Sequence, residues 1–340
     1  MRDSTRVGFA IAGCGTIAAY HARAIIALPD AAFVGAYSRT YEHAAAFCKT
    51  FGGAAFDTYT QLLEHPAVDA VAICSPSESH FALAKQALLH RKHVIIEKPM
   101  CLTLPEADEL LSFGRQTERS ISVISQTRFS PGVQAAAEAI RSGAFGERIS
   151  AALRMRYFRS QDYYDTAAWR RATPGGGVLM NQGIHGIDLL CWLMGRPTQV
   201  CGFARTACRQ MEAENTVAAA VLFDSGAVAT IDATTCSQPG FPRRLTLCGE
   251  NGTIVLDEDS VELWSLPAPC PVPLQEASGS SGAASPTGIL QSGHTQQYTN
   301  ILSHLLHGTP LLVDGEQGRT ALALILGILE ASRTGTVITL

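Results

Sequence analysis

The sequence lacks the patterns that mark several common classes of protein. Its 10 cysteines form no C-x-x-C pair and no zinc-like Cys/His spacing. Only 16% of the residues are charged, the net charge is -4, and there is no basic patch typical of nucleic-acid-binding proteins. No apolar run is long enough to span a bilayer, and the first residues show no export signal. We therefore expect a cytoplasmic protein without a metal, a nucleic-acid partner or a membrane segment.

Apolar residues are plentiful by contrast. They make up 46% of the 340 residues, which is enough for proper hydrophobic cores, and the length favours two domains. Several cysteines lie within apolar stretches, such as Cys74 in AVAICSP and Cys191 in LLCWLM. We expect such cysteines to be reduced thiols that serve as small buried side chains.

The first third of the chain alternates between strand and helix patterns. Strands are expected at 6–13, 31–38, 68–76, 93–99 and 120–126, with helices at 16–28, 41–51, 81–90 and 105–117. Buried strands that alternate with helices predict a doubly wound parallel sheet. We assign 1–125 to this dinucleotide-binding domain.

The pattern changes after residue 126. A helix at 131–142, a strand at 149–158, a loop at 159–173 and a long helix from Pro174 to Met194 precede strands within 216–235, 243–258 and 261–266. A loop without regular structure is expected at 267–293, outside the active site, followed by helices at 295–307 and 316–333 and a last strand. We assign 126–340 to an α/β domain that carries a large open, mainly antiparallel sheet and binds substrate.

A glycine-rich turn follows the first expected strand and begins the first helix. Gly13 allows a tight turn, Gly15 allows phosphate to approach the backbone, and the small Ala18 allows close packing of helix on strand. The first helical residues, Thr16 and Ile17, would offer free N–H groups to a pyrophosphate. This context favours a dinucleotide site over an ordinary strand–helix turn.

The end of the second expected strand carries no carboxylate. NAD-binding proteins of this kind often have one there for the ribose hydroxyls, whereas this chain has Ser38 and Arg39, and its first acid is Glu42. A hydroxyl and a guanidinium suit a 2′-phosphate, so NADP is the preferred cofactor and NAD the alternative. Arg39 could also be a solvated surface charge, with Ser38 as a helix N-cap.

Two further groups of residues carry candidate catalytic side chains. Lys98 lies at the end of the fourth expected strand, where ligands of open α/β sheets bind, and could exchange a proton with a substrate oxygen. Asn181, His185 and Asp188 share one face of the later helix, so His185 could touch a substrate hydroxyl. The alternatives are a surface lysine and a satisfied histidine in the core.

Four motifs together resemble the glucose–fructose oxidoreductase, inositol dehydrogenase and rhizopine-catabolism (Gfo/Idh/MocA) family. They are GxGxxA at 13–18, SPSESH at 75–80, HVIIEKP at 93–99 and GGGVLMNQGIHGIDLLCWLMG at 175–195. The likeness extends to HTQQYTNILSHLLHG and VDGEQGRTALALILGILEASRTG near the end of the chain. It therefore covers essentially the whole sequence.

The resemblance implies a Rossmann domain followed by an α/β domain with an open sheet, through which family members commonly form dimers or tetramers. It implies that Lys98 transfers a proton and that His185 binds the reacting oxygen or a neighbouring one. It further implies that the motif residues Ser75, Pro76, His80 and Glu97 lie at the cofactor. Many members have Asp where this chain has Asn181, which makes Asn181 a positioning group here. A branch acting on nucleotide-linked uronic sugars is similar in this respect.

Three side chains outside these motifs are candidate substrate contacts. Arg128 follows the fifth expected strand, and Trp169 and Arg170 lie in the aromatic loop before the GGG helix. Aromatic faces and arginines suit sugar rings and anionic groups, although loop packing and surface charge would explain the same residues.

The function predicted from these residues is an NAD(P)-dependent dehydrogenase or reductase. It would transfer a hydride between the cofactor and a carbinol or carbonyl carbon of a sugar, sugar nucleotide or cyclitol. The alternatives are a non-catalytic dinucleotide-binding sensor, or an enzyme of the same family that acts on anhydrosugars or dihydrodiols.

Overall fold

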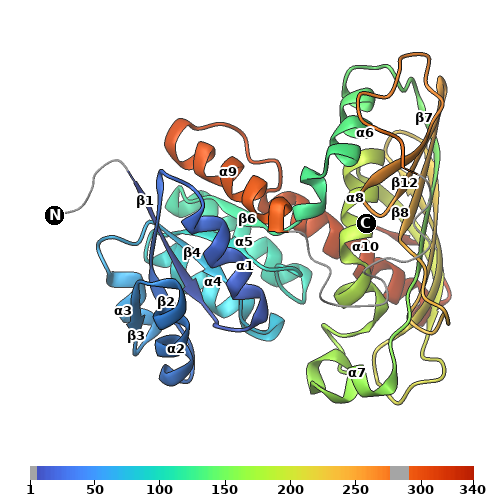
Figure 1. Ribbon diagram of the computed structural model, residues 1–340. Helices are drawn as coiled ribbons and strands as arrows, with labels where there is room; N and C mark the ends of the chain where they lie inside the picture. Colours follow the sequence, from blue (N-terminus) through green and yellow to red (C-terminus); the bar gives the residue numbers. More distant parts are fainter. Residues whose placement is uncertain (1–5, 276–290) are drawn as a thin grey trace. The chain divides into compact units, whose positions relative to one another are not determined.

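The computed structural model describes residues 6–275 and 291–340, which fold into two compact units (Figure 1). Unit 1 comprises Met1–Gln126 and Leu290–Arg319, and unit 2 comprises Thr127–Ile289 and Thr320–Leu340. The first boundary lies one residue beyond the expected one. A single continuous second domain was expected at 126–340, whereas the segment Leu290–Arg319 belongs to unit 1.

Unit 1 is built on a six-stranded sheet in which all neighbouring strands are parallel, as the alternating pattern predicted. The strand order is β3-β2-β1-β4-β5-β6. Every residue of β1 and β4 is buried, which is typical of strands covered on both faces. The strands are β1 (Val7–Ala12), β2 (Ala31–Tyr37), β3 (Ala54–Phe56), β4 (Ala70–Ile73), β5 (His93–Ile96) and β6 (Ile121–Val123).

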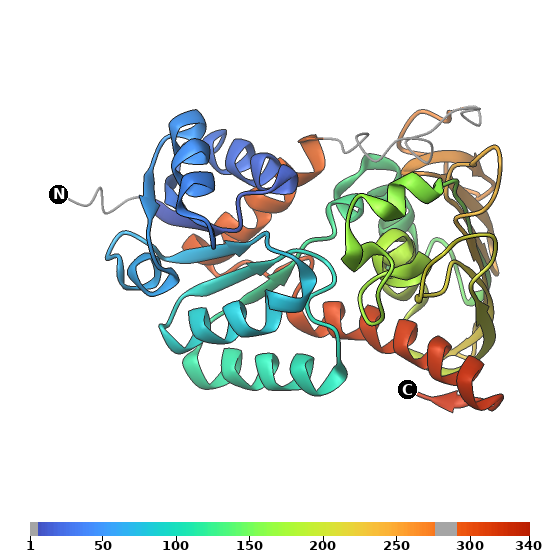
Figure 2. The same cartoon turned by 90° about the horizontal axis from the view of Figure 1, so that it is seen from below.

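Helices cover both faces of this sheet. Figure 2 shows α1 and α9 on one face and α4 and α5 on the other. The helix α9 belongs to unit 1 because Tyr298, Ile301 and Leu302 are buried in the same apolar cluster as Phe9 and Ile25. The helices are α1 (Thr16–Ile26), α2 (Tyr41–Phe51), α3 (Tyr59–Glu64), α4 (His80–Leu89), α5 (Leu104–Thr117) and α9 (Gln291–His307).

Local sequence signals explain where several helices begin. Thr103 accepts a hydrogen bond from the backbone of Glu106, and the Glu106 carboxylate accepts one from the backbone of Thr103, which makes a capping box at the start of α5. Pro105 lies in the first turn, where its missing N–H costs nothing. The helix therefore begins at Leu104, one residue before the expected start at 105.

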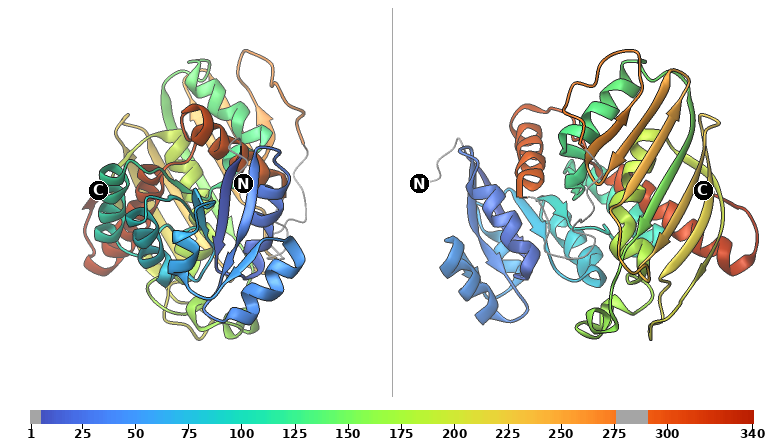
Figure 3. Two further views of the ribbon diagram at one scale, coloured as in Figure 1. Left: turned by 90° about the vertical axis from the view of Figure 1, so that its left-hand side faces the viewer. Right: turned by 45° about the vertical axis from the view of Figure 1, so that its right-hand side comes forward.

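Unit 2 contains an eight-stranded sheet in the order β13-β12-β11-β7-β10-β9-β8-β14 (Figure 3). Only β7 and β10 pair in parallel, so the sheet is mainly antiparallel, as expected. The turns at Asp224-Ser225-Gly226 and Glu250-Asn251-Gly252 join β9 to β10 and β11 to β12 as antiparallel hairpins. The strands are β7 (Arg148–Arg156), β8 (Pro197–Arg205), β9 (Thr216–Phe223), β10 (Val228–Thr234), β11 (Arg244–Gly249), β12 (Gly252–Asp257), β13 (Ser260–Trp264) and β14 (Ile338–Thr339).

One face of this sheet is packed by helices, and the other carries exposed apolar side chains. The helices α6 and α8 contact strands of the sheet. Phe203 is 77% exposed, and Leu222 and Val228 are also exposed. Unit 2 contains α6 (Pro131–Arg141), α7 (Gln161–Asp165), a π-helix (Val178–Gly183), α8 (Ile184–Met194) and the greater part of α10 (Gly315–Thr334).

The segment 267–293 was expected to lack regular structure, and the structure agrees with this only in part. Residues 267–275 contain no helix or strand, as expected, whereas 291–293 form the first residues of α9. The rest of the expected loop, 276–290, lies outside the described residues. Within the described part of the chain, no helix has both the length and the apolar character needed to cross a bilayer.

Candidate functional site

The glycine turn after β1 has the conformation that a dinucleotide site needs. Gly13 has φ +101°, and a Cβ there would lie 2.7 Å from the backbone nitrogen of Ser75, so only glycine fits. Gly15 is the N-cap of α1, which has no side-chain cap, and no atom lies within 4 Å of where its Cβ would be. The N–H groups at Thr16 and Ile17 therefore begin a helix whose N-terminus is open to a phosphate.

The end of β2 shows the residues that would distinguish the two cofactors. Ser38 is half-buried, and Arg39 is exposed. The N-cap of α2 is Thr40 rather than Ser38, so the capping alternative for Ser38 is wrong. The Ser38 hydroxyl is thus not used in a helix cap.

His80 links the loops that follow β4 and β5. Its ring is buried, with Nδ1 2.7 Å from the carbonyl oxygen of Pro99 and Nε2 2.9 Å from that of Ser75. Burial lowers the pKa of His80, so the ring is neutral and donates to one carbonyl at a time. Pro76, which precedes a short 3₁₀ turn at Ser77–Ser79, lies in the same loop.

Lys98 follows β5 at the carboxyl end of the parallel sheet. Its side chain keeps part of its surface exposed, and its backbone N–H donates to Glu97 Oε2 at 3.1 Å. Burial lowers the pKa of Lys98, and the nearby Glu97 carboxylate partly opposes this change. A lysine with a lowered pKa gives up its proton more readily than an ordinary lysine, which favours acid–base chemistry.

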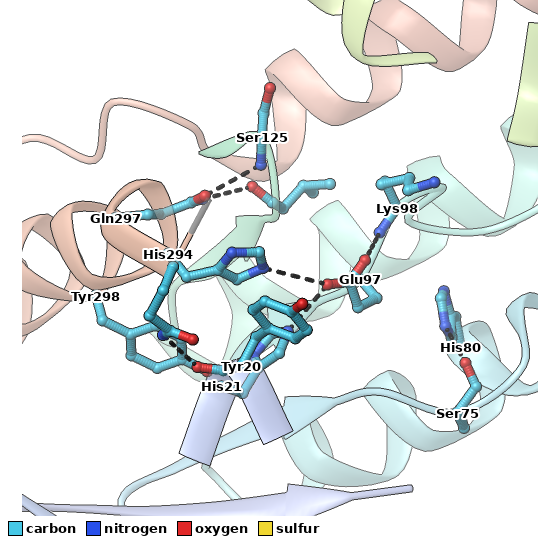
Figure 4. A network of polar contacts seen from close by, with 12 residues as sticks. Tyr20, His21, Ser75, His80, Glu97, Lys98, Ser125, His294, Gln297 and Tyr298 are labelled. Atoms are coloured by element: carbon cyan, nitrogen blue, oxygen red, sulfur yellow. Dashed lines mark hydrogen bonds and ion pairs between the residues drawn. The ribbon is translucent and has the colours of Figure 1, made fainter. Parts of the chain in front are cut away.

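A buried polar cluster lies beside Lys98 in unit 1 (Figure 4). Glu97 Oε1 lies 2.9 Å from His21 Nε2 and 4.0 Å from His294 Nε2, and His21 Nδ1 lies 2.7 Å from the Tyr298 hydroxyl. The side-chain atoms of His21, Glu97 and His294 that could ligate a metal ion lie within 4.8 Å of one another. The direct hydrogen bond between His21 and Glu97 makes this cluster a hydrogen-bond network.

In unit 2, the helix that carries Asn181 and His185 begins as a π-helix and continues as α8. An α-helix was expected throughout. The Glu214 carboxylate accepts a hydrogen bond from the backbone of Leu179 at 3.0 Å and so caps the start of this segment. Gly177 has φ +88°, and a Cβ there would lie 2.5 Å from the Glu214 carboxylate oxygens. The glycine is therefore needed for this cap.

Asn181, His185 and the aromatic loop belong to the same part of unit 2. Asn181 and His185 are both half-buried, and Asn181 Nδ2 lies 3.5 Å from the Tyr163 hydroxyl. The Arg170 guanidinium lies 4.3 Å from the centre of the Tyr163 ring and 5.4 Å from that of Trp169. Three of the predicted substrate contacts, Trp169, Arg170 and Asn181, are thus brought together around Tyr163. That these side chains bind substrate remains a prediction.

Arg128 has a different environment from the one expected. It is buried, and its guanidinium donates to both carboxylate oxygens of Asp188, at 2.7 and 2.5 Å, while lying 4.9 Å from the Trp192 ring centre. This bidentate pair joins the segment before α6 to α8. The structure therefore gives Arg128 a structural contact, and its role in substrate binding remains a prediction.

Sequence reasoning missed His21, His294 and Tyr298, which surround Glu97, and Glu214, which caps the π-helix. His294 and Tyr298 lie in the HTQQY segment, which was noted for its likeness to the family without a role for either residue. The buried face of α9 carries the polar side chains His294, Gln297 and Tyr298 beside Ile301 and Leu302.

Comparison with known protein families identifies the chain. Residues 7–125 match the model of the oxidoreductase family with an NAD-binding Rossmann fold, and residues 133–255 match the Gfo/Idh/MocA C-terminal domain. The chain belongs to the Gfo/Idh/MocA family of oxidoreductases. The resemblance drawn from the four motifs is therefore confirmed, as are the fold class and the prediction of an oxidoreductase enzyme.

Relatives within this family act on several kinds of sugar. The chain is 26% identical to 1,5-anhydro-D-fructose reductase from Ensifer adhaerens, over 95% of each chain. It is 31% identical to glucose-6-phosphate 3-dehydrogenase from Bacillus subtilis (strain 168), over 54% of this chain and 52% of that protein. The crystal structure of the WlbA dehydrogenase from Bordetella pertussis, in complex with NADH and UDP-GlcNAcA, superposes with a TM-score of 0.86 at 28% identity, over 98% of this chain and 99% of that one.

Proposed function

We propose that this member of the family transfers a hydride between a nicotinamide cofactor and a CH–OH or carbonyl carbon of a sugar, sugar nucleotide or cyclitol. The observation that carries the proposal is Lys98, a lysine with a lowered pKa at the carboxyl end of a Rossmann sheet. The printed names of the relatives, which include sugar dehydrogenases and a reductase, support the substrate class.

The residues of unit 1 fit a nicotinamide dinucleotide. The open N-terminus of α1 would hold the pyrophosphate through the turn from Gly13 to Ile17, and Ser75, Pro76, His80 and Glu97 would surround the nicotinamide end. Ser38 and Arg39 would bind the 2′-phosphate of NADP, which we propose as the preferred cofactor. When bound, the nicotinamide supplies the hydride acceptor or donor.

The residues of this chain then have distinct roles. In the oxidising direction, the neutral Lys98 amine accepts the proton of the substrate hydroxyl as the hydride leaves the same carbon; in the reducing direction, the ammonium returns it. His185 binds the reacting oxygen or its neighbour, and Asn181 positions a substrate hydroxyl. Arg128, Trp169 and Arg170 are proposed to contact the remainder of the substrate.

A substrate panel tests this function. Sugars, sugar nucleotides, uronic acids, cyclitols and anhydrosugars would each be incubated with the full chain and both nicotinamide cofactors, with the absorbance of the reduced nicotinamide as the readout. We expect turnover of at least one compound. Tight binding of cofactor with no turnover across the panel would contradict the proposal and favour the non-catalytic sensor.

We also propose that the chain forms a homodimer or homotetramer through the uncovered face of the unit 2 sheet, where Phe203 is exposed. Light scattering of the wild type and of Phe203→Asp would test this. A monomeric wild type, or an Asp variant with unchanged mass, would overturn it.

A further inference from the structure

A cavity of about 390 Å³ lies at the amino-terminal ends of the strands in unit 1, and its described lining residues all belong to that unit. It lies where the chain enters β1, β4, β5 and β6, which are neighbours in the parallel sheet. The glycine turn and Lys98 follow the carboxyl ends of β1 and β5, at the opposite ends of these strands. The proposed function therefore assigns no task to this cavity.

The wall of the cavity is strongly basic. Among its described lining residues, four side chains are cations and one, Asp69, is a carboxylate. The whole chain has a net charge of -4, so this local excess of positive charge is opposite in sign to the protein as a whole. A concave wall that carries charge of one sign attracts small ions of the other sign. The cations are Arg6, Arg91, Lys92 and Arg119.

The three arginines of this wall have no carboxylate partner among the described residues. Arg119 donates from Nε to the carbonyl oxygen of Arg91 at 2.7 Å and from Nη1 to that of Glu118 at 2.8 Å. Arg6 donates to the carbonyl oxygen of Ala31. The Arg91 guanidinium has neither a hydrogen bond nor an ion pair within the described part of the chain. The positive charge of these side chains is therefore not neutralised by a described carboxylate.

Other arginines of the same unit are arranged differently. Arg115 and Arg319 pair with the carboxylates of Glu316 and Asp108, at 3.1 and 2.5 Å. Around the cavity, by contrast, neutral backbone carbonyls hold Arg119 in place. A cation that is already held in position loses little conformational freedom when it binds an anion, which favours binding.

The turn after α4 places an arginine where helix stability alone favours glycine. The backbone N–H groups of Arg91 and Lys92 donate to the carbonyl oxygens of Leu88 and Ala87, both at 2.9 Å, in the Schellman motif that ends α4. Arg91 occupies the left-handed position of this motif, with φ +57°. This conformation is unfavourable for any residue with a Cβ, and glycine is usual there. A use of the Arg91 side chain would explain why the position is not glycine.

His93 adds a neutral hydrogen-bond donor to the wall. Its Nδ1 accepts the backbone N–H of Ser120 at 3.1 Å. Burial, together with the positive charge of Arg119, lowers the pKa of His93 to about 4, so the ring is neutral at pH 7. Its one hydrogen then lies on Nε2, which has no acceptor among the described residues.

Helix ends explain only part of this charge. Lys92 and Arg119 follow the C-terminal ends of α4 and α5, where a cation complements the helix dipole. One cation at each end would serve that purpose, whereas α4 is followed by both Arg91 and Lys92. Arg6 precedes a strand and complements no helix in this way. A ligand of negative charge accounts for all of these cations together.

We propose that this cavity binds phosphate, either as the free ion or as the phosphate group of a small ester. Arg6, Arg91 and Arg119 would hold the phosphate oxygens, because the planar guanidinium fork suits this group. The volume is that of a small-molecule site rather than of a bare ion. Leu305 and Leu306 line the same cavity and would contact the carbon skeleton of an ester. This site is separate from the catalytic site of the proposed function and does not depend on it.

Isothermal titration calorimetry of the full chain tests this site. The probes are inorganic phosphate and glycerol 3-phosphate, and glycerol is the uncharged control. Arg91→Gly removes one guanidinium and leaves the turn with its preferred residue, and Arg119→Gln removes a second charge. Arg115→Gln is the matched control, because Arg115 is an exposed arginine of the same unit that pairs with Glu316.

We expect the wild type to bind at least one of the two phosphate probes saturably, less tightly as salt is added, and not to bind glycerol. Arg91→Gly and Arg119→Gln should each weaken binding by about 5- to 20-fold, because contacts to charged groups are strong but this wall is partly open to solvent. Arg115→Gln should bind as the wild type does. The melting temperature of Arg91→Gly should be no lower than that of the wild type, which would show that the weaker binding is not a loss of fold.

The two probes distinguish the two sources of phosphate. Tighter binding of glycerol 3-phosphate than of inorganic phosphate identifies an ester as the ligand, and the reverse order identifies the free ion. Absence of saturable binding of both probes by the wild type would overturn the proposal. Binding that Arg91→Gly and Arg119→Gln both leave unchanged would also overturn it, because the anion would then lie elsewhere, such as at the open N-terminus of α1. No cofactor, substrate or turnover enters this experiment, so its outcome is independent of the proposed function.

Discussion

Replacing Glu214 by glutamine is expected to change stability in a pH-dependent way. The stability of Glu214→Gln minus that of the wild type should be greater at pH 8 than at pH 5. Burial raises the pKa of Glu214 from 4.5 to about 7, while hydrogen bonds from the backbone of Leu179 and Val178 act in the opposite direction. A raised carboxyl pKa means that the folded state binds more protons than the unfolded state between these two values. The stability therefore falls as the pH rises from about 4.5 to about 7 and is constant above that range.

The size of the effect follows from this shift. Each pKa unit corresponds to about 1.4 kcal/mol, so the full shift amounts to roughly 3 kcal/mol. Part of the Glu214 side chain reaches solvent, which reduces the expected difference to about 1.5–3 kcal/mol. For a domain of this size, that corresponds to roughly 3–12 °C in Tm. Glutamine keeps an acceptor for the Leu179 N–H and removes only the charge.

The assay is thermal unfolding of both proteins at pH 5 and pH 8. The Tm of Glu214→Gln minus that of the wild type should rise by several degrees between the two values. Glu212→Gln is the matched control, because Glu212 is exposed in the same loop and glutamine keeps an acceptor for the Thr173 backbone N–H. A Tm difference that is equal at both pH values would refute the reasoning.

Two further changes test the buried pair and the choice of cofactor. Asp188→Ala leaves the buried Arg128 without its bidentate partner and should lower the free energy of unfolding by about 3–5 kcal/mol. Asp232→Ala breaks the exposed pair with Arg156 and should lower it by less than about 1 kcal/mol. Equal losses of the two variants in denaturant unfolding would contradict this. NADPH should bind more tightly than NADH by roughly tenfold at low salt, and Arg39→Ala should remove that preference. Fluorescence titration with each reduced cofactor decides this point, and equal loss of both affinities would indicate stacking on the adenine instead.

Much of the fold could be predicted because its signals are local. The strands β1, β2, β4, β5 and β6 and the helices α1, α2, α4 and α5 are separated by turn residues. Thr103 and Pro105 mark the start of α5. The strand β3 was missed because three residues are too short to show a period. The strand β8 was missed because it exposes Phe203, which contradicts the rule that apolar side chains point inward.

The remaining features depend on contacts between distant parts of the chain. The sequence around His294 and Tyr298 predicts a helix, but that helix packs on α1, and so these residues meet His21 and Glu97 only in three dimensions. The burial of Arg128 depends in the same way on Asp188, 60 residues further on. Local patterns cannot separate a π-helix from an α-helix at 178–183, because both have apolar residues at similar spacing.

The central claim is that Lys98 transfers the proton that accompanies hydride transfer. Once the panel has supplied a substrate, kcat of Lys98→Met and of the wild type would be compared, together with the dissociation constant of the reduced cofactor. Lys85→Met is the control, because Lys85 is a half-buried lysine of the same unit that pairs with Glu109 at 2.7 Å. We expect a loss of about 10²–10⁴-fold in kcat for Lys98→Met with cofactor binding retained, and no loss for Lys85→Met. A Lys98→Met enzyme that turns over at nearly the wild-type rate would contradict it.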